Sequence, residues 1–248
     1  MKKSKLIDFL IIILVYIGLS CFPFGLIIKD ESLSWLILTL QIVVQAGLLT
    51  FIILFTIFKT ELNYKFGKIN IVNTLLLLPT LIVCFTNLIN LRAADVSYGV
   101  VADVNLFLNI LLTIFIVVNE EIIFRLLFIN NLEIKNKVLV ILLTAGVFGI
   151  CHITHFLTSF DPVDLLVIVY TFLLGLLLGF AYLFTKCIYP CIVIHLLFNI
   201  FNSVLFPHFS LDWTYILITA IIVVIVAVYV ILLFIIKMHK EKIQEVQQ

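Results

Sequence analysis

Eight long runs of apolar residues, separated by short polar segments, dominate the chain. A helix needs about 20 apolar residues to cross a bilayer, and each run approaches or exceeds that length. By this measure we expect membrane-spanning helices at 6–28, 34–58, 70–91, 104–130, 138–157, 163–186, 188–206 and 214–236. No polar connector is long enough to separate two domains. The pattern therefore predicts an all-α fold, a polytopic bundle of about eight transmembrane helices forming a single domain over residues 1–248.

Composition supports a membrane protein and narrows its chemistry. Hydrophobic residues make up 64% and charged residues 12% of the chain, whereas soluble domains carry about 25% charged residues. The net charge of +1 gives no basis for a nucleic-acid partner. The five cysteines lie in apolar runs without CxxC spacing, so we expect small buried side chains, not disulfides or zinc ligands. The basic start imitates a signal peptide, but its apolar run continues to Ile28, which predicts an uncleaved first helix.

Basic residues are distributed unevenly between the two sides of the predicted bundle. If the N-terminus is cytoplasmic, only Lys29 and Arg92 fall on the opposite side, and Arg125 lies within the fourth run. The remaining basic residues face the cytoplasm: Lys2, Lys3, Lys5, Lys59, Lys65, Lys68, Lys135, Lys137, Lys186, Lys237, Lys240 and Lys242. This positive-inside bias predicts an integral, multi-pass protein with both termini cytoplasmic. Its short loops and its Ile, Phe, Lys and Asn content favour a bacterial cell membrane. A C-terminal reporter should be active in the cytoplasm, and activity only outside it would contradict this topology.

The fourth run contains three charged residues in the segment "VVNEEIIFRLL". Each charge at the centre of a membrane helix costs about 2.5 to 3.5 kcal/mol on insertion-derived scales. Glu121 and Arg125 are four residues apart and share a helix face, so we expect them to pair. Glu120 is less well placed for Arg125 and needs a partner elsewhere. This segment alone fits equally well a polar network that holds helices together and a functional site.

The fifth run contributes histidines in "FGICHITHF". His152 is expected deep in this helix, with Phe148 one turn earlier on the same face. His155 lies nearer the outer end, where we expect an interfacial residue. The spacing of these two histidines is not that of the HExxH zinc motif, in which the ligands stand four residues apart. A packing role for His152 remains an alternative at this point.

The seventh run begins after Pro190, which suits a first helical turn, and carries "HLLFN". His195 and Asn199 are four residues apart, so their side chains point to one place, and both can donate hydrogen bonds. A hydrogen bond between membrane helices contributes only about 0.6 kcal/mol, too little to explain three polar clusters in three helices. Asn202 extends the polar face and is expected to serve packing. In the sixth run, Gly175 and Gly179 form GxxxG, which predicts close helix packing.

Together these clusters offer a carboxylate, two imidazoles and an amide, which is the equipment for hydrolysis of an amide bond by water. A buried glutamate can act as the general base, and a histidine can hold the same water or pass a proton to the leaving amine. A second histidine with asparagine can donate hydrogen bonds to the developing oxyanion. Removal of one such donor costs about 3 kcal/mol of barrier.

The three segments "EEIIFR", "FGICH" and "HLLFN" stand in the order EExxxR, FxxxH, HxxxN, each in a separate apolar run. In this the chain resembles the CAAX-processing and bacteriocin-processing (CPBP, or Abi) family of intramembrane glutamic endopeptidases. The stretch "LLLGFAYLFTKCIYPCIVIHLLFN" also resembles the family's approach to its third motif. The resemblance covers about residues 104–206, which we expect to be the catalytic core, with residues 1–103 as accessory N-terminal helices.

The resemblance implies a role for each candidate residue. Glu120 would activate water with His152, and His195 with Asn199 would form the oxyanion hole. Glu121 and Arg125 would order the site. The family implies an eight-helix bundle with a cavity open to cytosol and membrane, with no metal or other cofactor. Its partners would be a peptide or protein substrate and membrane lipid, and the eukaryotic members clip prenylated CAAX proteins.

Two other functions remain open at this level. Bacterial relatives are associated with peptide maturation, bacteriocin self-immunity and signalling, so the bundle could instead bind a bacteriocin-like peptide or a sensor partner without cutting it. A metal-dependent hydrolase would use Glu120, His152 and His195 as ligands, since three such ligands and a water match a catalytic zinc site. Arg125 nearby would oppose a cation. A transporter is disfavoured because no paired broken helices mark corresponding halves of the chain.

Overall fold

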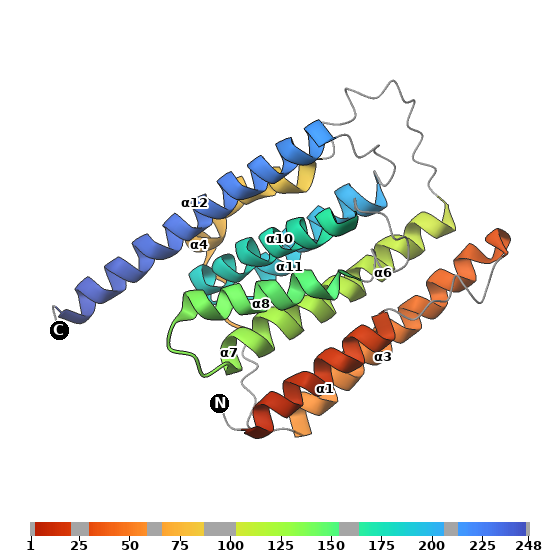
Figure 1. Ribbon diagram of the computed structural model, residues 1–248, viewed down its shortest axis with the longest axis horizontal. Helices are drawn as coiled ribbons and strands as arrows, with labels where there is room; N and C mark the ends of the chain where they lie inside the picture. Colours follow the sequence, from red (N-terminus) through yellow and green to blue (C-terminus); the bar gives the residue numbers. More distant parts are fainter. Residues whose placement is uncertain are drawn as a thin grey trace.

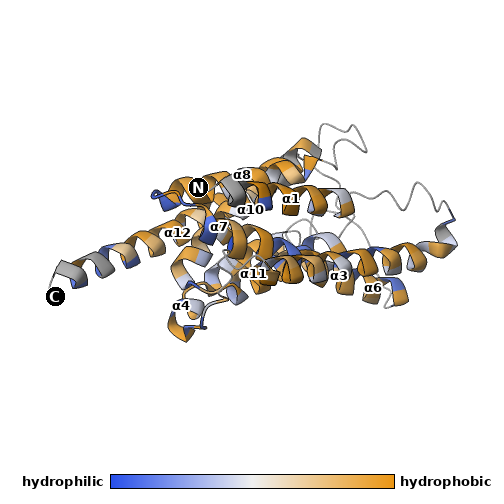
Figure 2. Ribbon diagram, turned by 90° about the horizontal axis from the view of Figure 1, so that it is seen from below, coloured by the Kyte–Doolittle hydropathy of each residue, from blue (hydrophilic) through white to orange (hydrophobic). Residues whose placement is uncertain are grey.

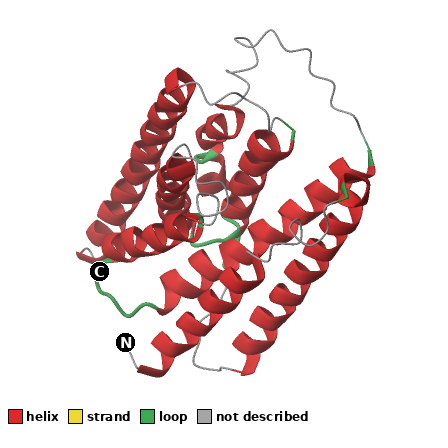
Figure 3. Ribbon diagram, turned by 45° about the vertical axis from the view of Figure 1, so that its right-hand side comes forward, coloured by secondary structure: helices red, strands yellow, loops and turns green. Residues whose placement is uncertain are grey.

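The computed structural model describes residues 3–20, 30–58, 66–86, 103–153, 164–205 and 213–246, and these form helices and turns without a strand (Figure 3). Each of the eight apolar runs contains helix, so the all-α class with about eight helices is confirmed. The α-helices are α1 (Lys3–Ser20), α3 (Ser34–Phe58), α4 (Ile71–Leu75), α6 (Val104–Glu121), α7 (Ile129–Asn131), α8 (Lys137–Cys151), α10 (Asp164–Thr185), α11 (Tyr189–Asn199) and α12 (Trp213–Val246). Two 3₁₀ helices, η1 (Glu31–Leu33) and η2 (Leu78–Phe85), and two π-helices, η3 (Ile122–Phe128) and η4 (Ile200–Val204), complete the described elements.

The long helices lie side by side with their axes roughly aligned (Figure 1). Helix α10 packs against α8 on one side and α12 on the other, whereas α3 packs against both α1 and α6. Helix α11 contacts α6, α10 and η2, and so lies between the two groups. The start of α1 and the end of α12 are at the same end of the bundle, as an even number of crossings requires.

The surface of this bundle suits a bilayer. Within the described residues, four helices are long and apolar enough to cross a membrane: Ser34–Phe58, Val104–Asn131, Val167–Thr185 and Leu217–Lys240. The other four apolar helices are shorter in the described residues: Ile7–Ser20, Ile71–Phe85, Lys137–Cys151 and Tyr189–Val204. Figure 2 shows hydrophobic residues along most of the length of the helices, and many large apolar side chains face outward, such as Leu14 and Phe107. The protein is therefore an integral membrane protein.

The third apolar run departs from the expected continuous helix. A short α-helix ends at Leu75 and is followed by the 3₁₀ helix η2, which contains Pro79 in its first turn. Proline lacks a backbone N–H, and its ring clashes with the carbonyl four residues earlier, which is that of Leu75. The chain tightens at this point, since the Leu77 amide donates to the Thr74 carbonyl only three residues back. The last expected residues of this run, 87–91, lie outside the described ranges.

Close packing between α8 and α10 depends on glycines. A Cβ atom on Gly175 would lie 3.1 Å from the Cα and Cβ of Ala145, and one on Gly179 would lie 2.8 Å from Ile141. Both distances are shorter than an ordinary contact between carbon atoms. The predicted close approach at GxxxG is confirmed, and α8 is the partner. This contact fixes the helix at whose end His152 lies.

Candidate functional site

Two carboxylates and a histidine meet where α6 faces α11. Glu120 and Glu121 are the last residues of α6, and His195 lies in the middle of α11. The Nδ1 atom of His195 lies 2.8 Å from Oε1 of Glu121, and its Nε2 atom lies 3.6 Å from Oε2 of Glu120. The exposed fractions of Glu120, Glu121 and His195 are 3%, 0% and 2%. The sequence predicts the two glutamates in one helix and His195 in another, and the structure brings them together in the interior.

The contact with Glu121 determines how the His195 ring is used. An ionised carboxylate only accepts hydrogen bonds, so Nδ1 of His195 carries the hydrogen and donates it to Glu121. The amide Nδ2 of Asn199 lies 3.4 Å from Nε2 of the same ring. In a neutral ring Nε2 accepts from this amide. In a ring protonated on both nitrogens, Nε2–H and the Asn199 amide become two donors side by side.

The position of α11 follows from local sequence features. Pro190 lies in the first turn of the helix, as predicted. The Sγ atom of Cys84 in η2 donates to the carbonyl of Ile194, which is the residue before the site histidine. Asn202 reaches the same region of η2, where its Nδ2 donates to the Cys84 carbonyl at 3.4 Å. This contact is consistent with the packing role predicted for Asn202.

Arg125 pairs with Glu121, as the four-residue spacing predicts. Its Nε atom lies 3.2 Å from Oε2 of Glu121, and both side chains are almost completely buried. This contact is an ion pair without hydrogen-bond geometry, because Oε2 of Glu121 and both Nη atoms of Arg125 have no hydrogen-bond partner. The guanidinium carbon lies 4.7 Å from the centre of the Phe148 ring. The ring face thus supplies part of the stabilisation that the buried cation needs.

His152 lies beside the cluster, at the end of α8 and not deep within a longer helix. It is the first residue after the helix and is half-exposed. Its Nδ1 lies 2.9 Å from the Phe148 carbonyl, which can only accept, so Nδ1 carries the hydrogen and Nε2 has the lone pair in the neutral ring. The Phe148 ring packs edge-to-face against both His152, at 4.9 Å, and His195, at 5.8 Å. The end of the predicted helix, including His155, lies outside the described residues.

Two of the three motif-bearing helices, α6 and α11, continue directly into π-helices. Helix α6 ends at Glu121 and continues as the π-helix η3, which contains Arg125. Helix α11 ends at Asn199 and continues as η4, in which the Leu205 amide donates to the Ile200 carbonyl five residues back. Such π-helical turns are rare and are frequent at functional sites. The apolar periodicity of the two runs carries no signal that would have predicted them.

Tyr16 of α1 also contacts the cluster, and the sequence analysis did not single it out for this role. Its hydroxyl donates to Oε1 of Glu120 at 2.5 Å, and the tyrosine is 5% exposed. Its ring packs edge-to-face against Phe124, with centroids 6.1 Å apart. Tyr16 is the outside partner that the sequence analysis required for Glu120. A single hydroxyl within "IIILVYIGL" was the only available signal, and it does not say which helix the tyrosine faces.

A second set of hydrogen bonds connects α6, α3 and α1, one helical turn beyond Tyr16 along α1. The Asn119 amide donates to Oε1 of Gln45 at 2.8 Å, and Nε2 of Gln45 donates to Oγ of Ser20 at 3.2 Å. A cavity of about 50 Å³ adjoins these groups, lined by Leu19, Ser20, Gln41, Val44, Gln45, Leu112 and Ile116. Ser20 is one helical turn from Tyr16 along α1, and Ile116 is one helical turn from Glu120 along α6. The cavity has the size and polar lining that ordered water requires.

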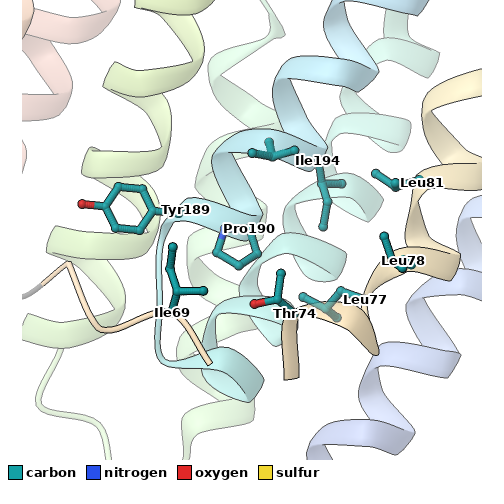
Figure 4. Close-up of a pocket in the computed structure, with 9 residues that line it drawn as sticks. Ile69, Thr74, Leu77, Leu78, Leu81, Tyr189, Pro190 and Ile194 are labelled. Carbon is teal, nitrogen blue, oxygen red and sulfur yellow. The ribbon is translucent and has the colours of Figure 1, made fainter. Parts of the chain in front are cut away.

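A larger apolar cavity lies on the other side of α11. Its volume is about 200 Å³, and Figure 4 shows its walls, which come from α4, η2 and the start of α11. Leu77, Leu81 and Pro190 are among its lining residues. Ile194, which also lines it, directly precedes His195 in the sequence. None of the six predicted site residues lines either cavity. His152 and Asn199 are the two predicted site residues that are partly exposed, whereas the other four are buried.

The fold and this cluster define a class: a polytopic helical membrane protein with carboxylates, histidines and an arginine gathered inside the bundle. Residues 102–201 match the family model described as type II CAAX prenyl endopeptidase Rce1-like. This match confirms the predicted CPBP resemblance over that segment and supports a membrane endopeptidase in general terms. The matched segment contains all six predicted site residues. No curated protein and no solved structure matches the chain.

Proposed function

We propose that the protein is an intramembrane endopeptidase in which Glu120 and His152 activate a water molecule, and His195 with Asn199 stabilises the oxyanion. The observation that carries the proposal is the convergence of Glu120 and His195 from two helices, within 3.6 Å and in the interior of an apolar bundle. Its substrate is a peptide bond in a membrane-associated protein or peptide. The family match supports the reaction class, and the roles of the residues are inferred from the contacts.

The oxygen of the Glu120 carboxylate that activates water is the one that Tyr16 does not contact. Oε1 of Glu120 accepts the tyrosine hydroxyl, whereas Oε2 faces His195. The Glu120 carboxylate takes a proton as water attacks the scissile carbonyl carbon. His152 holds the same water through the lone pair on Nε2, or takes the proton from Glu120 at that lone pair and passes it to the leaving amine. Its Nδ1 hydrogen is engaged by the Phe148 carbonyl, which keeps the ring in one orientation.

The oxyanion would lie between the two donors of α11. The Asn199 amide and a doubly protonated His195 present hydrogens from adjacent positions, because their nitrogen atoms are 3.4 Å apart. Glu121 balances the charge of that imidazolium through its contact with Nδ1. Arg125 in turn holds the second oxygen of Glu121. Glu121 and Arg125 therefore order the oxyanion donors without contacting the substrate.

We also propose that the reaction uses no metal ion. The nearest cation to the carboxylates is Arg125, at 3.2 Å from Glu121, and a second cation in the same place would be repelled. Oε1 of Glu120 and Oε1 of Glu121 are already engaged by Tyr16 and His195. In the part of the chain that the structure describes, no group of three His, Cys, Asp or Glu side chains has the arrangement of metal ligands.

The proposed setting is a bacterial cell membrane with both termini in the cytoplasm. The uneven distribution of lysines supports this orientation, and the start of α1 lies at the same end of the bundle as the end of α12 (Figure 1). The substrate then reaches the cluster from the bilayer or the cytosol, so membrane lipid is the second partner. A peptide or sensor protein that binds without being cut is the alternative partner.

The experiment compares membrane and secreted peptides from cells carrying wild-type protein or His152→Ala, at matched expression. We expect one precursor to accumulate uncut in the variant. His239→Ala serves as control, because His239 is an exposed histidine on α12. Purified wild-type protein should still cut that precursor after dialysis against a chelator. Identical peptides, under conditions where deletion of the protein has a phenotype, would contradict proteolysis and favour the immunity or sensor-binding role.

A further inference from the structure

We infer that Tyr16 is a positioning residue of the site: its hydroxyl fixes the Glu120 carboxylate so that one chosen oxygen acts as the base. Tyr16 lies in α1, outside the segment 102–201 that matches the family model. The inference rests on the proposed role of Glu120. It adds the first helix to the machinery of the reaction, although the three sequence motifs lie in three other helices.

The hydrogen bond between Tyr16 and Glu120 is expected to be strong. The hydroxyl donates to Oε1 at 2.5 Å, and the two residues are only 5% and 3% exposed. Hydrogen bonds to ionised groups are roughly twice as strong as those between neutral groups. Solvent does not compete at this depth, so the bond holds the carboxylate more firmly than a surface contact would.

Packing determines where the hydroxyl lies. The Tyr16 ring is edge-on to Phe124, and Phe124 is edge-on to Phe148 at 5.1 Å. The same Phe148 ring contacts both histidines of the site. A row of aromatic rings therefore connects α1 with the histidines, and the tyrosine has little freedom to turn away.

A second set of hydrogen bonds connects α1 with the end of α6. Ser20 is one turn beyond Tyr16 on the same helix, and its Oγ accepts a hydrogen bond from Gln45 of α3. Gln45 in turn accepts from Asn119, the residue directly before Glu120. Helix α1 is thus connected with the end of α6 at two successive turns. Tyr16 provides one of these connections directly, and Ser20 provides the other through Gln45.

This arrangement has a chemical consequence. With Oε1 engaged by Tyr16, Oε2 is the oxygen that faces His195 and the reacting water. A base contributes fully only when it is held close to its productive geometry. Loss of the hydroxyl frees the carboxylate to rotate between orientations. The rate of the chemical step should then fall, while peptide binding, which does not involve Tyr16, should not change.

Tyr16→Phe tests this directly, because the ring and its contact with Phe124 are retained. We expect kcat to fall about ten-fold or more, as loss of a hydrogen bond to a charged group predicts, with KM unchanged. The matched control is Tyr182→Phe. Tyr182 is 4% exposed, and its hydroxyl accepts from Asn130 at 2.7 Å, away from the cluster. This control should keep the wild-type kcat, and Tyr16→His, which retains a ring with a donor, should recover part of the loss.

The outcomes separate this inference from the proposed function. A wild-type kcat in Tyr16→Phe, with Glu120→Gln inactive, would overturn the positioning role and leave the protease intact. An equal decrease in Tyr182→Phe would also overturn it, since the effect would then belong to any buried hydroxyl. Undiminished cleavage by Glu120→Gln would instead overturn the proposed function itself. If Tyr16→Phe folds poorly, kcat is calculated per amount of folded protein. A kcat in Tyr16→His no higher than in Tyr16→Phe would then overturn the positioning role.

Discussion

Glu120→Gln is expected to lower kcat by about 10²- to 10⁴-fold, the usual contribution of a general base, while the protein still inserts and binds its peptide. The amide has nearly the same shape as the carboxylate, and its oxygen can still accept the Tyr16 hydroxyl that now contacts Oε1. It cannot take a proton from water. The loss should therefore appear in kcat and not in KM. The measurement is steady-state cleavage of the identified precursor by purified protein at matched folding.

The control for this variant is Asp8→Asn. Asp8 is a buried carboxyl group, 7% exposed, that lies about two turns from Tyr16 along the apolar helix α1. A comparable loss in Asp8→Asn would mean that any buried carboxylate supports the fold, and that Glu120 has no special role. Full activity in Glu120→Gln would exclude that residue as the base, whatever the behaviour of Asp8.

The second large effect concerns stability. Glu121→Leu leaves the Arg125 guanidinium buried at 2% exposure without its counter-ion. Removal of one partner from a buried ion pair costs about 3–5 kcal/mol, so we expect the free energy of unfolding to fall by that amount. The double variant Glu121→Leu with Arg125→Met removes both charges and should recover most of the stability. Equilibrium unfolding in mixed detergent micelles measures both.

Activity should not follow stability in this pair of variants. Glu121→Leu removes the acceptor at 2.8 Å from Nδ1 of His195, and the double variant does not restore it. The stable double variant is therefore expected to remain inactive. If the double variant were as unstable as the single one, the ion pair would not be the source of the loss. If it were stable and fully active, Glu121 would not be needed to order His195.

The contacts that could be predicted from the sequence are those within one helix. Glu121 with Arg125, and His195 with Asn199, are four residues apart, and helix geometry alone places each pair on one face. A close helix approach at Gly175 and Gly179 was also predicted from their four-residue spacing, but the spacing does not say that α8 is the partner. Pro79 predicts a break as well, although the sequence analysis expected the helix to continue through it.

Contacts between helices could not be predicted in the same way. Tyr16 and Glu120 are separated by 104 residues, and their meeting depends on how α1 and α6 are rotated about their axes. That rotation is set by packing over whole helix faces, such as the aromatic row from Tyr16 to Phe148. For the same reason the division into a core at 104–206 and accessory helices at 1–103 stays a prediction. The Tyr16 contact places one residue of the first helix beside that core.

The two π-helical turns also affect how related chains should be compared. A π-turn uses five residues where an α-helix uses four, so a chain lacking one residue between Ile122 and Phe128 could continue as a plain α-helix. The wider turn takes up the extra residue, so the residues beyond it keep nearly the direction that they would have in that plain α-helix. A relative could thus lack one residue of this segment and still present the same helix face to its neighbours beyond it. Alignments of such chains should place single-residue gaps within Ile122–Phe128 and Ile200–Val204.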